Sequence, residues 1–300
     1  SLSIKLHSSH LVGMEMNYHF LHENNAKKTY EVNVILFHSC DNRTVSREQQ
    51  IKFNIYDPDD KWIQNITAGK LHQIVISDGA DGPCMTSGQN RCITRTIYQA
   101  EISLPVVEGK YRLIYEKCCR ENHITNLYVS GSQAMTIETF VPGASSINNQ
   151  TPIMLESESF NVCNGDELVL DFGVSDPDGD SLVYSFYKSL HGITWANKEK
   201  NLTQPYFNKV RFSHPYSHMR PFHTLNGVSI DSKTGLVTGI PAEMGIFQWG
   251  IKIDEYRNGK WLNSNMFDRS IQIIACTPKK DTAGIHHLQE CSRADAFNVK

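Results

Sequence analysis

An acidic turn that runs directly into an alternating strand constrains the fold of this chain more than any other feature. Residues 176–186 have the sequence Asp-Pro-Asp-Gly-Asp-Ser-Leu-Val-Tyr-Ser-Phe, and residues 226–241 have the sequence Asn-Gly-Val-Ser-Ile-Asp-Ser-Lys-Thr-Gly-Leu-Val-Thr-Gly-Ile-Pro. The first segment predicts a tight bend followed by a strand, and the second predicts two short strands joined by a Thr-Gly turn. Both segments favour a β-sandwich.

Short alternating segments of this kind recur along the whole chain, whereas helical i, i+3, i+4 patterning is scarce. The 300 residues therefore predict an all-β protein with two tandem immunoglobulin-like β-sandwich domains and an extended C-terminal tail. The small, polar, proline-bounded segment 142–152 marks the domain boundary. We expect residues 1–145 to form the N-terminal sandwich, 146–278 the second sandwich and 279–300 the tail.

The charge balance argues against two classes of partner. The formal net charge of -3, from 29 basic and 32 acidic residues, gives no electrostatic reason to expect nucleic acid or an anionic membrane surface. No apolar run approaches the ~18 residues of a membrane span, so direct membrane insertion is not expected. Because the chain begins Ser-Leu-Ser without a methionine, we expect a trimmed N-terminus.

Eight cysteines favour an oxidising compartment. Cys84 and Cys92 flank the polar loop Met-Thr-Ser-Gly-Gln-Asn-Arg, and no Cys-x-x-Cys metal motif occurs. A disulfide between Cys84 and Cys92 would constrain the unfolded chain by about 2.5 kcal/mol. We therefore predict this disulfide and an extracytoplasmic location, either secreted or associated with the cell surface or outer membrane.

The remaining cysteines leave several pairings open. Cys118 and Cys119 are adjacent, so on a strand their side chains point to opposite faces and favour different partners. A bond between these two neighbours is the alternative. Cys163 and Cys276 lie at the start and end of the second half, where a disulfide could join its first and last strands.

The acidic turn is the candidate metal site. Asp176, Asp178 and Asp180 place three carboxylates within five residues, and Ca2+ prefers six to eight oxygen ligands in flexible geometry. Asp254 and Glu255 near the end of a later strand are candidates for a further ligand, and of the two we predict Asp254. The alternative is an Asp-Pro-Asp-Gly turn in which the side chains cap their own backbone amides.

Catalytic motifs are absent from the sequence. There is no Gly-x-Ser-x-Gly, Walker or His-Glu-x-x-His pattern, so a non-enzymatic protein is expected. Trp195 and Trp261 follow loop or turn residues and could form a platform for glycans, although a structural role at a loop rim explains them too. A carbohydrate-binding module is therefore the alternative function, and a hydrolase with two facing carboxylates is a more remote one.

Five segments carry a resemblance to a known family. They are residues 9–18 (Ser-His-Leu-Val-Gly-Met-Glu-Met-Asn-Tyr), 115–122 (Tyr-Glu-Lys-Cys-Cys-Arg-Glu-Asn), 176–185, 230–241 and 255–259 (Glu-Tyr-Arg-Asn-Gly). In this order they resemble the N-terminal region of large surface proteins linked to gliding motility and type IX secretion in bacteria. The second half is also similar to bacterial immunoglobulin-like and cadherin-like modules, in which the acidic turn is associated with calcium.

The resemblance implies a non-enzymatic exported protein that acts by protein–protein binding, as an adhesin or as an accessory module of the gliding and type IX secretion apparatus. The expected partners are outer-membrane or cell-surface proteins of that apparatus, with glycans as the alternative. Members of the family are long and continue into a C-terminal sorting domain. The shorter length of this chain favours an accessory subunit held by other proteins.

Overall fold

The computed structural model describes residues 11–40, 48–78, 85–86, 91–154, 161–172, 174–192 and 207–278. Within these ranges the protein is all-β, as the alternating pattern predicts, with one short 3-10 helix, η1 (Ser130–Ser132). The predicted tail over residues 279–300 lies outside the described residues. None of the described helical segments is long and apolar enough to cross a membrane.

The first half of the chain carries long strands. In chain order they are β1 (Leu11–Asn24), β2 (Lys27–Ser39), β3 (Gln50–Tyr56), β4 (Trp62–Asp78), β5 (Met85–Thr86), β6 (Arg91–Pro105), β7 (Lys110–Lys117) and β8 (Met135–Pro142).

The second half carries many short strands and one long hairpin. In chain order they are β9 (Ile153–Met154), β10 (Asn161–Cys163), β11 (Leu168–Asp171), β12 (Val174–Ser175), β13 (Ser181–Phe186), β14 (Leu190–His191), β15 (Asn208–Lys209), β16 (Ser229–Ile230), β17 (Leu236–Gly239), β18 (Gly245–Arg257), β19 (Lys260–Ile274) and β20 (Thr277–Pro278).

Local sequence explains individual strands and their turns. In β3 the buried Ile51, Phe53 and Ile55 alternate with residues that are more exposed, which is the period of a strand with one face in the core. The β18–β19 hairpin turns at Asn258 and Gly259, whose φ angles are 52° and 72°. An Asn-Gly pair suits a two-residue hairpin turn, because both positions need a left-handed backbone.

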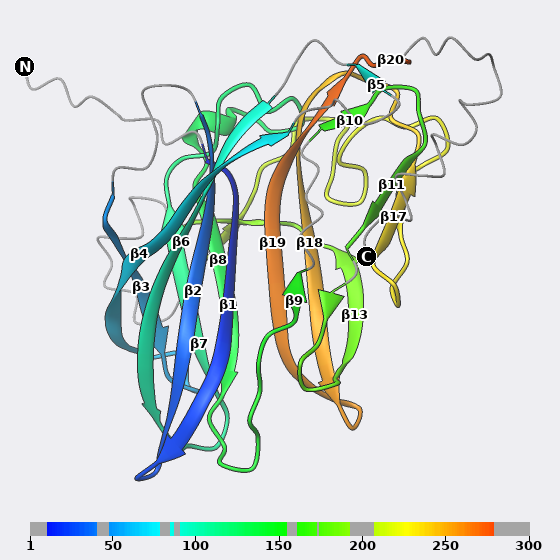
Figure 1. Ribbon diagram of the computed structural model, residues 1–300. Coiled ribbons are helices and arrows are strands. Elements are labelled where there is room, and N and C mark those ends of the chain that lie inside the picture. Colours follow the sequence, from blue (N-terminus) through cyan, green and yellow to red (C-terminus); the bar gives the residue numbers. More distant parts are fainter. Residues whose placement is uncertain are drawn as a thin grey trace, which may run out of the picture.

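One sheet runs through both halves of the chain (Figure 1). Its strand order is β13-β18-β19-β1-β2-β6-β4-β3-β7-β8-β14-β15, and β10 pairs with β19 beside this path. The halves join where β1 pairs with β19, with Gly13 opposite Arg269 and Met14 opposite Asp268. The strands of the first half and the β18–β19 hairpin of the second are therefore hydrogen-bonded neighbours.

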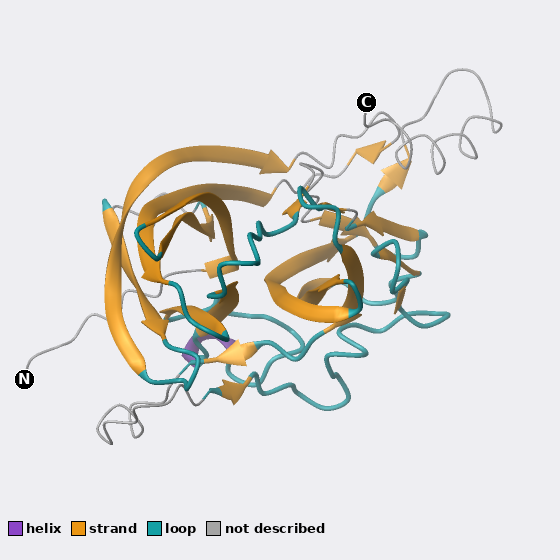
Figure 2. Cartoon of the chain, turned by 90° about the horizontal axis from the view of Figure 1, so that it is seen from below, coloured by secondary structure: helices purple, strands orange, loops and turns teal. Residues whose placement is uncertain are grey.

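Two apolar cores lie on either side of this junction. The first is built mainly from β1, β2, β3, β6, β7 and β8, and the second mainly from β11, β13, β17, β18 and β19. Figure 2 shows the corresponding strands as two curled groups side by side. The two immunoglobulin-like domains and the boundary at residue 145 stay predictions, because the sheet itself is continuous across them.

Buried ion pairs hold the two curled groups together along β19. Arg120 donates to both carboxylate oxygens of Asp268, at 2.7 and 2.5 Å, and both side chains are almost wholly buried. Arg269 forms a second buried ion pair, with Glu15 on β1. A buried charge that loses its partner costs several kcal/mol, roughly 3–5, so these pairs fix the register of β19 against the first half.

The disulfides correct two of the predicted pairings. Cys92 bonds to Cys40 and not to Cys84, because β2 and β6 pair along their length and bring Cys40 beside Cys92, whose carbonyl accepts the Cys40 N–H at 2.9 Å. Cys118 and Cys119 bond to each other, so the expectation that they take different partners is wrong.

The pairing suggested for Cys163 and Cys276 is confirmed. Cys163 ends β10, which runs parallel to β19, and Cys276 follows β19 by two residues. The parallel pairing carries both cysteines to the same end of the second half. Disulfides of this kind are typical of extracellular proteins, which agrees with the predicted compartment.

Candidate functional site

The predicted acidic turn forms between β12 and β13. Asp176 Oδ1 accepts the backbone N–H groups of Asp178 and Asp180, each at 2.9 Å. Gly179 has a φ of 77°, a conformation that glycine adopts without steric cost. The turn thus caps its own backbone, as the alternative to metal binding proposes.

Arg257 neutralises two of the three aspartates. Its Nε and one terminal nitrogen bind Asp180 at 2.7 and 2.8 Å, and the same terminal nitrogen lies 3.3 Å from Asp178. Hydrogen bonding to Asp180 raises the pKa of Arg257. Asp178 also accepts the backbone and side-chain amides of Gln150, at 2.7 and 3.1 Å. Asp178 and Asp180 are therefore held by a cation that belongs to the protein itself.

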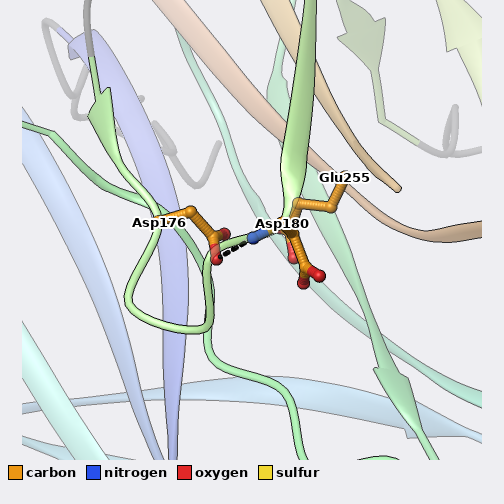
Figure 3. Close-up of side chains that lie close together, drawn as sticks. All are labelled: Asp176, Asp180 and Glu255. Atoms are coloured by element: carbon orange, nitrogen blue, oxygen red, sulfur yellow. Dashed lines mark hydrogen bonds between the residues drawn. The ribbon is translucent and has the colours of Figure 1, made fainter. Parts of the chain in front are cut away.

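Glu255 is the residue of β18 that joins the turn. Carboxylate oxygens of Asp176, Asp180 and Glu255 lie within 4.8 Å of one another (Figure 3). Asp178 lies outside this group. Asp254, the predicted ligand, also lies outside the group. Successive residues of a strand face opposite sides, so Asp254 points away from Glu255 and contacts Ser264 and Lys252. We call Asp176, Asp180 and Glu255 the carboxylate cluster.

Glu255 lies in an unusual environment for a carboxylate. It is fully buried, and burial raises its pKa to about 8. Three side-chain amides oppose this shift: Asn263 and Asn265 donate to Oε1 at 3.0 and 2.6 Å, and Asn149 donates to Oε2 at 2.8 Å. These donors come from β19 and from the segment between β8 and β9, so the folded state assembles the environment of Glu255 from distant parts of the chain.

One oxygen of the cluster has no partner. Asp176 Oδ2 is buried and accepts no hydrogen bond, whereas Oδ1 accepts two. Burial raises the pKa of Asp176 above its usual value. A buried polar atom without a partner carries a desolvation penalty of roughly 1–3 kcal/mol. A proton or a bound cation between Asp176 and Glu255 would remove that penalty.

A groove lies on a different part of the surface, where the large sheet passes from the first half to the second. It has a volume of about 240 Å³. Its apolar lining comes from four strands of the large sheet and from β9: Met16, Ile35, Ile74, Ile76, Ile153 and Phe267. Glu15, Asn17, Arg95, Pro152 and Asn265 complete the lining. We call this feature the junction groove.

Exposed apolar side chains flank the junction groove. Of the residues that line it, Ile74 on β4 is 37% exposed and Ile153 on β9 is 58% exposed. Single exposed apolar residues are ordinary, but two in the lining of one hollow mark a surface that can bind a partner. The groove and these residues therefore form a second candidate site, of an apolar kind.

The tryptophans predicted for glycan binding fare differently. Trp195 lies outside the described residues. Lys110 Nζ lies 3.3 Å from the centroid of the Trp261 ring, and Phe140 packs edge-on against that ring at 5.3 Å between centroids. Because protein groups already contact the Trp261 ring, it offers less surface for a sugar than an open platform would.

Sequence reasoning missed the junction groove and Arg95. The lining residues come from β1, β2, β4, β6, β9 and β19, so no local motif contains them. The run Leu-His-Gln-Ile-Val-Ile at residues 71–76 was a usable signal. Its three consecutive apolar residues put apolar side chains on both faces of the strand, including a face that would otherwise carry polar residues.

Comparison of the chain with family models, with curated proteins and with solved structures found no match to any of them.

Proposed function

We propose that this protein is an exported, non-enzymatic surface protein that acts by protein–protein binding, as an adhesin or as an accessory module of a gliding-motility or type IX secretion apparatus. The observation that carries the binding part of this proposal is the junction groove with its exposed apolar rim. Apolar surface that is exposed to water is stabilised when a partner covers it, so an exposed apolar patch favours partner binding. The link to gliding and secretion rests on the resemblance of the sequence motifs alone.

Two further features support export and surface display. Three disulfides join described cysteines, which favours an oxidising compartment. The two apolar cores are consistent with two tandem immunoglobulin-like sandwiches that share one sheet, and we retain that architecture as part of the proposal. Such sandwiches display loops and sheet faces for binding.

The direct test is affinity purification of the tagged chain from the native cell envelope. Wild type is compared with Ile74→Ser, which removes an exposed apolar side chain from the groove lining, and with Leu225→Ser as the control, since Leu225 is 73% exposed and does not line the groove. We expect an outer-membrane or surface protein in near-stoichiometric amount with wild type and Leu225→Ser, and much less with Ile74→Ser. Recovery of the chain alone would contradict the proposal and favour glycan binding.

We also propose that the carboxylate cluster binds a divalent cation, with Ca2+ as the candidate. The unpartnered Asp176 Oδ2 favours this proposal, since a cation would satisfy it and would stabilise the buried charge of Glu255. Arg257 acts against it by holding Asp180. Asp176 and Glu255 are thus the two residues that would hold the ion, and its role would be to stiffen the junction of turn and strand.

Thermal melting tests the cation proposal. If a cation binds the folded state alone, the melting temperature rises in excess Ca2+ relative to excess chelator. The Asp176→Asn variant should lose this rise. Asp57→Asn, in an acidic turn that lacks a buried third carboxylate, should keep it. An unchanged wild-type melting temperature in Ca2+ and chelator would rule out the site.

A further inference from the structure

The edge of β4 beside the junction groove has an unpaired stretch. The first part of β4 pairs with β3 as far as Gly69, and the second part, from Gly69 to Asp78, pairs with β6. A bulge at Leu71 lies just inside the part that pairs with β6. On the side away from β6, no described strand pairs with residues 71–78, which we call the β4 edge segment. Unpaired backbone N–H and C=O groups can accept another strand.

Beyond the bulge at Leu71, this edge lacks two of the usual protections against added strands. Edge strands are commonly guarded by lysine or proline. The β4 edge segment has the sequence Leu-His-Gln-Ile-Val-Ile-Ser-Asp, with neither lysine nor proline. Leu71 and Val75 are exposed, as is Ile74 at 37%. The edge is therefore suited to pairing with an extended segment.

The junction groove is positioned to take side chains from such a segment. Ile74 and Ile76 are two residues apart on β4, so they share one face of the sheet, and both line the groove. A strand added along the β4 edge would place every second side chain on that same face. Its apolar side chains would then cover Ile74 and Ile76 from water.

Arg95 adds a charge requirement to this groove. Arg95 lies opposite Ile74 on β6 and lines the groove, and its Nε is buried without a hydrogen-bond partner. No described residue forms an ion pair or hydrogen bond with its guanidinium. The carboxylate of Glu15, also in the groove lining, is paired with Arg269. The groove therefore carries one uncompensated positive charge among apolar walls, which favours a carboxylate.

We propose that the β4 edge segment binds an extended segment of a partner protein by strand addition, with alternating apolar side chains over the junction groove and one aspartate or glutamate paired with Arg95. This inference rests on the proposed protein-binding function and names the kind of segment recognised. Main-chain pairing supplies affinity in this mode, while the groove and Arg95 select the sequence.

A random nine-residue peptide library displayed on phage is the probe. Selection on the wild-type chain should enrich peptides with alternating apolar residues and one acidic residue at a fixed position. Synthetic versions are then measured by fluorescence anisotropy, each beside the same peptide with glutamine at the acidic position. We expect the acidic peptide to bind at least about tenfold more tightly, because a carboxylate–guanidinium pair is charge-assisted.

Three variants complete the test. Arg95→Gln should abolish the preference for the acidic peptide, Ile74→Ser should weaken both peptides, and Leu225→Ser should change neither. No enrichment, equal binding to acidic and neutral peptides, or equal binding to all variants would overturn the proposal. Self-association of the chain that Ile74→Ser abolishes would overturn it as well, in favour of a second copy as occupant.

The envelope purification distinguishes failure of strand addition from failure of protein binding as such. If Ile74→Ser and Arg95→Gln recover the same surface protein as wild type, the strand-addition inference fails while the protein-binding function stands. If neither wild type nor any variant recovers a partner, the proposed function itself fails.

Discussion

The chain contains two acidic turns with nearly the same local geometry and different surroundings. In the first, Asp57 Oδ1 accepts the backbone N–H groups of Asp59 and Lys61, each at 2.9 Å. In the second, Asp176 Oδ1 accepts the N–H groups two and four residues on, at the same distance. Each turn also has an arginine partner from a distant strand. The Asp-Pro-Asp sequence thus specifies a capped turn in both places.

The difference lies in the third carboxylate. Beside the second turn, the buried Glu255 meets Asp176 and Asp180 within 4.8 Å. Beside the first turn, Asp60 is half exposed and forms an ion pair with Arg112, which also binds Glu138. The comparison teaches that local sequence creates the turn, whereas a strand more than 70 residues away supplies the buried carboxylate on which the proposed cation site depends.

The largest expected effect concerns Glu255 and pH. Burial raises its pKa from 4.5 to about 8, so the folded state favours the neutral carboxyl. Its stabilising contribution is full below pH 4.5 and is lost as pH rises towards 8. In chelator, the difference in unfolding free energy between wild type and Glu255→Gln should therefore fall by up to about 1.4 kcal/mol per pH unit across this window. Urea unfolding at pH 5, 6.5 and 8 measures it.

A parallel pH profile for the two proteins would contradict this account of Glu255. Excess Ca2+ should flatten the wild-type profile, because a bound cation favours the ionised carboxylate. The same series with Glu138→Gln serves as the matched control, since Glu138 lies beside the first turn and is paired with Arg112.

The second prediction compares Arg257, which binds the second acidic turn, with Arg112, which binds the first. Arg257→Ala leaves Asp178 and Asp180 without a cation and should destabilise the protein in chelator by about 1–3 kcal/mol. Added Ca2+ should restore part of that loss. Arg112→Ala should cost a similar amount, because it leaves Glu138 without its ion-pair partner, but Ca2+ should not restore the lost stability. Equal recovery of both variants, measured as unfolding free energy, would show that the turns do not differ as described.

The smallest effect concerns the backbone of the turns. Gly179→Ala should cost about 1 kcal/mol, because φ is 77° and no neighbouring atom lies close enough to obstruct or favour the added methyl. In the first turn, Asp60 has a φ of 60°. Asp60→Gly relieves this backbone but loses the exposed ion pair with Arg112, so its net effect should stay within about 0.5 kcal/mol. Chemical denaturation resolves the two values.

The alternation of apolar and polar residues, together with the turn-forming residues, made much of the fold predictable. The segment 176–186 predicted a bend followed by a strand, and β13 covers Ser181–Phe186. The segment 226–241 predicted two short strands, and β16 covers Ser229–Ile230 while β17 covers Leu236–Gly239. The lengths of some strands were not predictable in this way. β4 runs over 17 residues, whereas its alternation is clear only at residues 73–76, because a bulge at Leu71 shifts the register of β4 against β6.

Long-range pairing explains what the sequence could not predict. Cys92 meets Cys40 through the pairing of β2 with β6, although Cys84 is far closer in the chain. Glu255 rather than Asp254 reaches the carboxylate cluster, since one position along a strand reverses the face. The groove around Arg95 is lined by residues from six strands, so the role of Arg95 can be recognised only in the folded protein.

Hydrogen–deuterium exchange on the complex recovered from the cell envelope tests the central claim most directly. The account predicts that backbone amides of residues 71–78 become protected when the partner binds, with weaker protection at β9 and little change around Asp176–Asp180. Protection confined to other surfaces, with residues 71–78 exchanging as in the isolated chain, would contradict binding at the junction groove.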